Sequence, residues 1–288
     1  MLSRSRAPGD VASDPLTWID SPTYAEFGWP SGPTSRFRVG DVEFRCEFGE
    51  SHDRVFSIRK DRVRIEEYLN IVERFKTDNF VELGIGSGGS VALTALVAPP
   101  RKLVALDLGP DRVDALDKLI AERDLSERVR LHYGADQADR QRLMSILDDE
   151  FGNEPLGLVV DDASHRLDET RASFEVLFPR LRPGGLFVIE DWNHQQLISR
   201  DLAAALADPS PELKARILRR IAEGPPDPPL TRLVIELILV GAESGEVVRE
   251  VRVDRRWAHV YRGKGELDRS EFRLADFITN DFGLLPAK

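Results

Sequence analysis

The glycine-rich segment at residues 82–90 has the composition of a ligand-binding turn, Glu82-Leu83-Gly84-Ile85-Gly86-Ser87-Gly88-Gly89-Ser90. Glycine has no Cβ, so a turn rich in glycine lets a ligand approach the backbone closely. The spacing by itself also fits the pyrophosphate of a dinucleotide. However, the carboxylate of Glu82 would repel a pyrophosphate and attract a cation. This favours the ammonium and sulfonium groups of S-adenosylmethionine as the ligand.

Acidic residues after the next two apolar runs are expected to complete this cofactor site. Asp107 ends the second run, where a carboxylate can bind ribose hydroxyls. Asp136 follows the third run and is expected to accept from the adenine amino group, with Gln137 beside it. A helix cap or turn residue is the alternative for Asp107, and turn chemistry for the other two. The predicted cofactor-binding residues are Glu82, Gly84, Gly86, Ser87, Ser90, Asp107, Asp136 and Gln137.

Short apolar runs alternate with helical segments and must position these residues. Strands are expected at 80–83, 103–106, 129–133, 156–160 and 186–189, and helices at 91–97, 111–123, 139–147 and 168–181. This alternation indicates a parallel sheet covered by helices on both faces. A further helical region at about 197–222 ends at a proline-rich break, 225–229. Beyond it, the β-rich segments 233–240 and 247–261, joined at 243–246, are expected to form an antiparallel pair.

A second set of residues capable of chemistry ends the fourth and fifth strands. Each pair of acids has a histidine three residues beyond it, Asp161-Asp162 with His165 and Glu190-Asp191 with His194. The carboxyl ends of neighbouring parallel strands meet at the edge where open α/β sheets bind ligands. Acids crowded there repel one another unless a cation is present. Hard oxygen ligands without cysteine favour Mg²⁺, or Mn²⁺, over a thiophilic metal.

Two motifs around these acids resemble those of a known enzyme family. They are Val159-Val160-Asp161-Asp162-Ala163-Ser164-His165 and Leu181-Arg182-Pro183-Gly184-Gly185-Leu186-Phe187-Val188-Ile189-Glu190-Asp191-Trp192. Both motifs and their spacing look like the sugar O-methyltransferases of macrolide biosynthesis. Those include the macrocin and mycinamicin enzymes and the relatives often labelled cephalosporin hydroxylase. The resemblance covers roughly residues 79–195 and leaves the N-terminal portion without a counterpart.

The resemblance implies metal ligands Asp162, Glu190 and Asp191, with His165 as general base. Adjacent strand residues face opposite ways, so Asp161 is expected to point away and remains the alternative to Asp162. His194 remains the competing base. A divalent cation helps to deprotonate an aliphatic hydroxyl, and an imidazole can remove its proton near neutral pH. Methyl transfer then follows as an in-line displacement at the sulfonium carbon.

The fold class that follows is α/β, a Rossmann-like class I methyltransferase. We expect a seven-stranded, mostly parallel sheet with an antiparallel final hairpin and helices on both faces. The predicted divisions are an N-terminal arm with a small hairpin, 1–60, a methyltransferase domain, 61–265, and a C-terminal tail, 266–288. Within the first, residues 1–35 are expected to be irregular and 36–48 to form the hairpin. An amphipathic helix is expected at 61–75.

Composition limits the partners and the location. The net charge of −10 disfavours nucleic acid and anionic membranes, which both need a positive surface. No apolar run is long enough to cross a bilayer, and the N-terminus lacks the pattern of a secretory signal, so a cytoplasmic protein is expected. A lone cysteine, Cys46, excludes an internal disulfide and a cysteine-based zinc site. The aromatic arm and the family resemblance predict a homo-oligomer, a dimer or tetramer.

The predicted function is a magnesium-dependent O-methyltransferase. It would move a methyl group from S-adenosylmethionine to a hydroxyl of a small natural product, expected to be a glycosylated one that is methylated on the sugar. One alternative keeps the cofactor and uses a catechol-like or other acceptor. Another is a non-catalytic member that binds the cofactor or a partner, and an oxidoreductase is the least favoured alternative.

Overall fold

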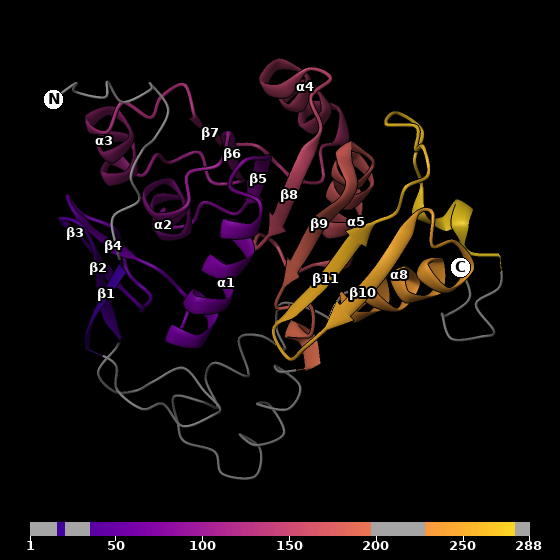
Figure 1. Ribbon diagram of the computed structural model, residues 1–288, viewed down its shortest axis with the longest axis horizontal. Coiled ribbons are helices and arrows are strands. Elements are labelled where there is room, and N and C mark those ends of the chain that lie inside the picture. The colour runs from indigo at the N-terminus through magenta and orange to yellow at the C-terminus, as the bar shows by residue number, and fades with distance from the viewer. Residues whose placement is uncertain (1–15, 21–34, 197–227, 280–288) are drawn as a thin grey trace, which may run out of the picture. The chain divides into compact units, whose positions relative to one another are not determined.

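The computed structural model describes residues 16–20, 35–196 and 228–279 (Figure 1). The chain divides into two compact units, Met1–Gly134 and Ala135–Lys288. The three divisions expected from the sequence stay a prediction. None of the helices in the described ranges has the length and apolar character that a membrane span requires.

A small sheet of four strands opens the first unit, in the order β1-β2-β3-β4. Its strands are β1 (Leu16–Asp20), β2 (Arg36–Val39), β3 (Val42–Arg45) and β4 (Val55–Ser57). The hairpin expected at 36–48 is confirmed, and it turns at Gly40, whose φ is 57°. The expectation of an irregular arm is wrong for residues 16–20, which pair antiparallel with β2. The Trp18 ring lies 4.9 Å from that of Phe37, so an aromatic contact accompanies the pairing.

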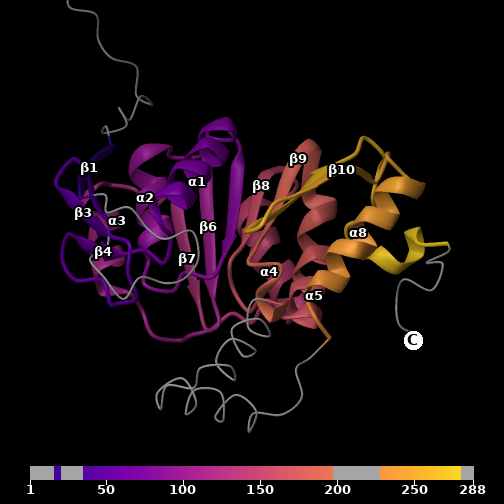
Figure 2. The same ribbon diagram turned by 90° about the horizontal axis from the view of Figure 1, so that it is seen from below.

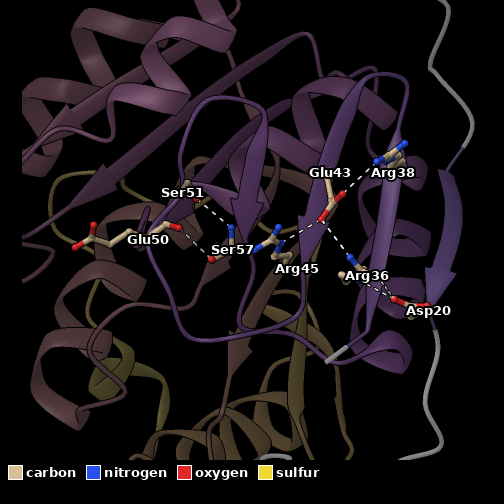
Figure 3. A network of polar contacts seen from close by, with 8 residues as sticks. All are labelled: Asp20, Arg36, Arg38, Glu43, Arg45, Glu50, Ser51 and Ser57. Carbon is tan, nitrogen blue, oxygen red and sulfur yellow. Dashed lines mark hydrogen bonds and ion pairs between the residues drawn. The ribbon is translucent and has the colours of Figure 1, made fainter. Parts of the chain in front are cut away.

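The two faces of the small sheet differ in character. The Phe37 and Phe44 rings stack at 4.8 Å, and both side chains are buried. The opposite face is polar, and Figure 3 shows its charged residues. Glu43 accepts from Arg45 Nε at 3.1 Å and from Arg38 Nη2 at 3.3 Å. Period-two alternation in the sequence therefore produces one buried and one charged face.

The remainder of the first unit alternates helices and strands. In order these are α1 (Arg62–Arg74), β5 (Asn79–Leu83), α2 (Gly89–Val97), β6 (Lys102–Asp107), α3 (Asp114–Glu122) and β7 (Val129–Tyr133). The Asp61 side chain caps α1 by accepting from the backbone N–H of Arg64 at 2.9 Å. Strands β5, β6 and β7 pair in parallel, with Glu82 opposite Ala105. The elements predicted here are confirmed to within a few residues at their ends.

The second unit contains the remaining described elements. They are α4 (Arg140–Phe151), β8 (Leu156–Asp161), α5 (Leu167–Leu177), η1 (Phe178–Arg180), β9 (Leu181–Glu190), α8 (Thr231–Glu243), β10 (Val248–Val253), β11 (Trp257–Arg262) and η2 (Leu274–Phe277). Strands β8 and β9 pair in parallel, whereas β11 is antiparallel to both β9 and β10. Helix α8 packs on β10 and against α5 (Figure 2). This unit supplies the antiparallel end of the larger sheet.

The larger sheet has seven strands in the order β10-β11-β9-β8-β5-β6-β7. Its last two strands along the chain, β10 and β11, form an antiparallel hairpin, and helices flank the strands. The predicted seven-stranded, mostly parallel sheet with an antiparallel final hairpin is thus confirmed.

One prediction about that hairpin is wrong, because residues 233–240 form helix α8 instead of a strand. Buried residues recur there at helical spacing, at Leu233, Val234, Leu237 and Val240. The hairpin lies within the segment predicted as its second strand, apart from Arg262, the last residue of β11. Its turn is built on Asp254, whose Oδ1 accepts from the backbone N–H of Trp257 at 2.8 Å. The helix predicted at 197–222 lies outside the described residues.

Candidate active site

In the first unit, Asp107 and the glycine-rich turn are in direct contact. Asp107 Oδ2 accepts from the backbone N–H groups of Ile85 at 2.9 Å and Gly86 at 2.8 Å. Its Oδ1 accepts from the N–H of Gly109 at 2.7 Å. Asp107 is therefore not a helix cap, since α3 begins only at Asp114. The carboxylate fixes the turn between β5 and α2 to the end of β6.

The backbone of the turn needs glycine at its second half. Gly88 has a φ of 80°, and a Cβ there would lie 3.2 Å from the Leu116 side chain. Gly84 and Gly86 also have positive φ, 96° and 52°. Helix α2 starts at the next residue, Gly89, and Ser90 is buried in its first turn. Positive φ is ordinary for glycine and costly for other residues, so the sequence pattern fixes this turn's shape.

Glu82, at the end of β5, is a buried carboxylate with only 1% of its surface exposed. The Tyr68 hydroxyl donates to Glu82 Oε2 at 3.1 Å. That hydroxyl is also 2.7 Å from Thr94 Oγ1, so the threonine is the donor in the second bond. The buried ammonium of Lys60 lies 5.5 Å from the Tyr68 ring. A carboxylate in such a low-dielectric setting interacts strongly with a neighbouring cation.

The other two predicted cofactor contacts, Asp136 and Gln137, belong to the second unit. Asp136 is exposed, and its Oδ1 accepts from the Ala138 N–H at 2.8 Å, as in the turn alternative. Gln137 is buried, and its Nε2 donates to Asp161 Oδ2 at 3.1 Å. Its Oε1 accepts from the N–H of Ser164 at 3.2 Å. The amide of Gln137 therefore binds the segment that follows β8.

Asp161, the last residue of β8, faces the interior. Besides Gln137, it accepts from Ser173 Oγ at 3.2 Å and from the Ala163 N–H at 3.3 Å. Loss of hydration raises the pKa of Asp161 to about 6, although the charge of His165 and the hydrogen bonds from Ala163 and Ser173 act in the opposite direction. Its burial and its three partners indicate a role in shaping the turn before α5.

Asp162, the residue after Asp161, lies beside His165. Asp162 Oδ1 lies 3.8 Å from His165 Nε2, and both side chains are partly exposed. His165 has a φ of 54°, a left-handed conformation that is uncommon outside glycine. Its carbonyl accepts from Gln195 Nε2 at 3.0 Å, and its ring lies 5.4 Å from that of His194. Both candidate bases thus lie near each other, with Asp162 beside the first.

The three predicted metal ligands are only partly brought together. Asp161 pairs with Ile189 across β8 and β9. Asp162 directly follows β8, and Glu190 is the last residue of β9, so each lies one residue beyond this pair. Glu190 is buried, whereas Asp191 is partly exposed and its N–H donates to the Arg256 carbonyl at 2.9 Å. Within the described ranges, no three or more His, Cys, Asp or Glu side chains are grouped to hold a metal ion. The ligand set therefore stays a prediction.

The structure adds three residues that the sequence analysis missed. Tyr68 contacts Glu82, Gln195 contacts His165, and Ser51 donates to the Ser87 carbonyl at 2.5 Å. Each lies at least 14 positions along the chain from its partner. No local motif marks such residues, because only the tertiary fold brings them to the site.

Comparison with known families bears on the segment that contains the turn and the acids. Residues 81–192 match a family model described as a methyltransferase domain. The match begins inside β5 and ends two residues after Glu190, so it includes Glu82, Asp107 and Asp162.

Known O-methyltransferases are similar to part of this chain. The mycinamicin VI 2''-O-methyltransferase of Micromonospora griseorubida is 35% identical over 167 residues, which are 55% of this chain and 34% of that protein. The demethylmacrocin O-methyltransferase of Streptomyces fradiae is 38% identical over 78 residues, 21% of this chain and 19% of that protein. The predicted resemblance is confirmed. The chain spans about a third or less of the length of these relatives.

A solved relative is the MycE methyltransferase from the mycinamycin biosynthetic pathway, in complex with Mg, SAH and mycinamycin VI. It is 25% identical to this chain, with a TM-score of 0.48. The match covers 69% of this chain and 49% of that one.

Proposed function

We propose that this chain is an S-adenosylmethionine-dependent O-methyltransferase. Its acceptor would be a hydroxyl on the sugar of a small glycosylated natural product. The observation that carries the proposal is Glu82, a buried carboxylate at the end of β5, directly before a turn whose amides are fixed by Asp107. A negative charge there suits a cationic methyl donor and disfavours a pyrophosphate. The named activities of the relatives support the sugar acceptor.

His165 is proposed as the base that takes the acceptor's proton. The hydroxyl oxygen then forms a bond to the methyl carbon, and the electron pair of the breaking carbon–sulfur bond stays on sulfur, leaving a neutral thioether. A carboxylate beside the imidazole stabilises the charge that the proton brings, and Asp162 lies 3.8 Å from His165 Nε2. His194 is the competing base because its ring lies 5.4 Å from that of His165.

Magnesium dependence is a separate part of the proposal. It is supported by the relative solved with Mg and by the positions of Asp162, directly after β8, and Glu190, at the end of the neighbouring strand β9. Against it, the described chain does not group three ligands. A metal held by Asp162, Glu190 and Asp191 would therefore require these side chains to move together. A homo-oligomeric state and a cytoplasmic location remain predictions.

The proposal is tested by methyl transfer from isotopically labelled S-adenosylmethionine to a panel of glycosides, catechols and simple alcohols, followed by mass spectrometry. We expect label only on a sugar hydroxyl. Label on a catechol would show that the acceptor is not a sugar, and the methyltransferase activity would still be supported. Cofactor binding with no transfer to any member of a broad panel would favour the non-catalytic alternative, whereas binding of NADH would favour an oxidoreductase.

The same assay after full chelation with EDTA tests the metal. Lost turnover that Mg²⁺ or Mn²⁺ restores would support the ligand set. Undiminished turnover would show that the reaction does not require a metal, and proton transfer to His165 would remain as the mechanism. The observation that favours this second, metal-free candidate is the absence of a grouped ligand trio among the described residues.

A further inference from the structure

The loop between β3 and β4 contacts the glycine-rich turn through two hydrogen bonds in opposite directions. Ser87 Oγ donates to the carbonyl of Gly49 at 2.6 Å. Ser51 Oγ donates to the carbonyl of Ser87 at 2.5 Å. Ser87 is therefore held through its side chain and through its backbone. We refer to the contacts of Gly49 and Ser51 with Ser87 as the serine clamp.

The loop is itself fastened to β4, as Figure 3 shows for Glu50, Ser51 and Ser57. The backbone N–H of Ser57 donates to Ser51 Oγ at 3.1 Å. The Ser57 hydroxyl donates to the carbonyl of Glu50 at 3.3 Å. Because the Ser51 hydroxyl accepts from β4 and donates to the turn, it relays the position of the strand to residue 87.

Close packing supports the same connection. A Cβ added at Gly89 would lie 2.3 Å from the Ser57 carbonyl oxygen and 2.8 Å from the Ile58 Cβ. Helix α2, which begins at Gly89, contacts β2 and β4 of the small sheet. The first residue of α2 is thus in contact with the end of β4. The turn cannot shift without disturbing the small sheet.

We infer that the small N-terminal sheet positions the methyl-donor site, with Ser51 as the positioning residue. The inference rests on the proposed function, since it assigns the turn to the donor. A clamp that favours one conformation of the turn raises the fraction of molecules able to bind, and apparent affinity scales with that fraction. By thermodynamic linkage, a donor that binds the clamped turn stabilises the clamp in return.

The first test compares S-adenosylmethionine affinity by calorimetry in wild type and Ser51→Ala. The variant keeps the backbone and removes the relay hydroxyl. We expect a dissociation constant about three- to tenfold higher, the effect of one hydrogen bond, with a native circular dichroism spectrum. The matched control is Ser126→Ala, at an exposed serine of the same unit, which should bind as wild type does. Equal affinities in wild type and Ser51→Ala would overturn the inference.

The second test is hydrogen exchange at the Ser57 amide, which needs no acceptor. We expect protection in the wild type, further slowing when S-adenosylmethionine saturates the protein, and faster exchange in Ser51→Ala. An unprotected amide would refute the clamp. A protected amide in a protein that binds no S-adenosylmethionine would instead refute the proposed function and the donor role, and would leave the contact itself standing.

Discussion

The donor turn of the first unit and the acid–histidine segment of the second are built in different ways. Around the turn, backbone amides of Ile85 and Gly86 meet one carboxylate, Asp107, and glycines take the positive φ values. In the second unit the residues with positive φ include His165 and Asp191, which are themselves candidate functional residues. The first region is shaped by residues suited to its backbone, whereas the second holds reactive residues in an uncommon conformation.

That difference indicates which contacts hold the backbone conformation of each region. A left-handed conformation at a residue other than glycine costs about 1–2 kcal/mol, and surrounding contacts must offset it. For His165 those contacts are long side chains from elsewhere, with Gln137 accepting from the preceding amide of Ser164 and Gln195 donating to its carbonyl. Loss of a reactive residue in the second region should therefore reduce turnover most, and loss of a single supporting contact in either region should have a smaller effect.

The largest effect is expected from His165→Ala. Removal of a general base costs about 100- to 10,000-fold in turnover. Affinity for S-adenosylmethionine should be unchanged, because Glu82 and the glycine-rich turn are intact. His52→Ala is the control, since this histidine has 74% of its side chain exposed and lies in the first unit. Wild-type turnover in His165→Ala would move the base role to His194.

Asp162→Ala should follow, with turnover reduced about 100-fold, if this carboxylate binds the metal or stabilises the protonated imidazole. Asp161→Ala is the informative partner variant. It removes a buried acceptor of three hydrogen bonds, so we expect it to lower the free energy of unfolding by about 1–3 kcal/mol. Urea unfolding and turnover measured on both variants separate the roles. If Asp161→Ala lost turnover and Asp162→Ala lost only stability, Asp161 would be the ligand.

Gly89→Ala is expected to be the most damaging single change in the donor region. The added Cβ would lie 2.3 Å from the Ser57 carbonyl oxygen, so α2 and β4 must move apart. Overpacking of this kind costs about 1–3 kcal/mol of unfolding free energy, measured by urea denaturation. Gly245→Ala is the control, because its Cβ would meet no atom within 4 Å. Equal midpoints of urea unfolding for the two variants would show that the contact between α2 and β4 accommodates the added Cβ.

Gln195→Glu should have the smallest effect of the series, about tenfold on turnover, with donor affinity unchanged. The substitution keeps the side-chain shape and removes the N–H that donates to the His165 carbonyl at 3.0 Å. The matched control is Gln196→Glu, the same change at an exposed neighbour. A lower donor affinity in Gln195→Glu would show that the two regions do not depend on separate supports.

The parts of the fold that follow from local patterns could be predicted from the sequence. The strand ends before Gly84 and at Asp107 are marked by apolar runs that stop at glycine or an acid. Residues 233–240 were not predictable in the same way, because a short apolar run interrupted only by Glu236 has no clear period that separates a helix from a buried strand. In the structure this segment is part of helix α8, which packs on β10 and α5.

Within the candidate site, residue types were easier to predict than contacts. The carboxylates and His165 lie where parallel strands end, which the sequence pattern indicates. The partner of Gln137 is not indicated, because its amide reaches Asp161, 24 positions along the chain. The contact of Ser51 with Ser87 spans 36 positions and depends on how the small sheet meets α2. Such contacts follow from tertiary packing, and no local spacing encodes them.

The most direct test of the account is the affinity of Glu82→Gln for S-adenosylmethionine, measured by calorimetry beside wild type and the exposed control Glu73→Gln. The buried charge at the end of β5 is the claimed recognition element for the cationic donor. We predict one donor bound per chain, a dissociation constant about 30-fold higher in Glu82→Gln, and no change in Glu73→Gln. Equal affinity of wild type and Glu82→Gln would contradict the account.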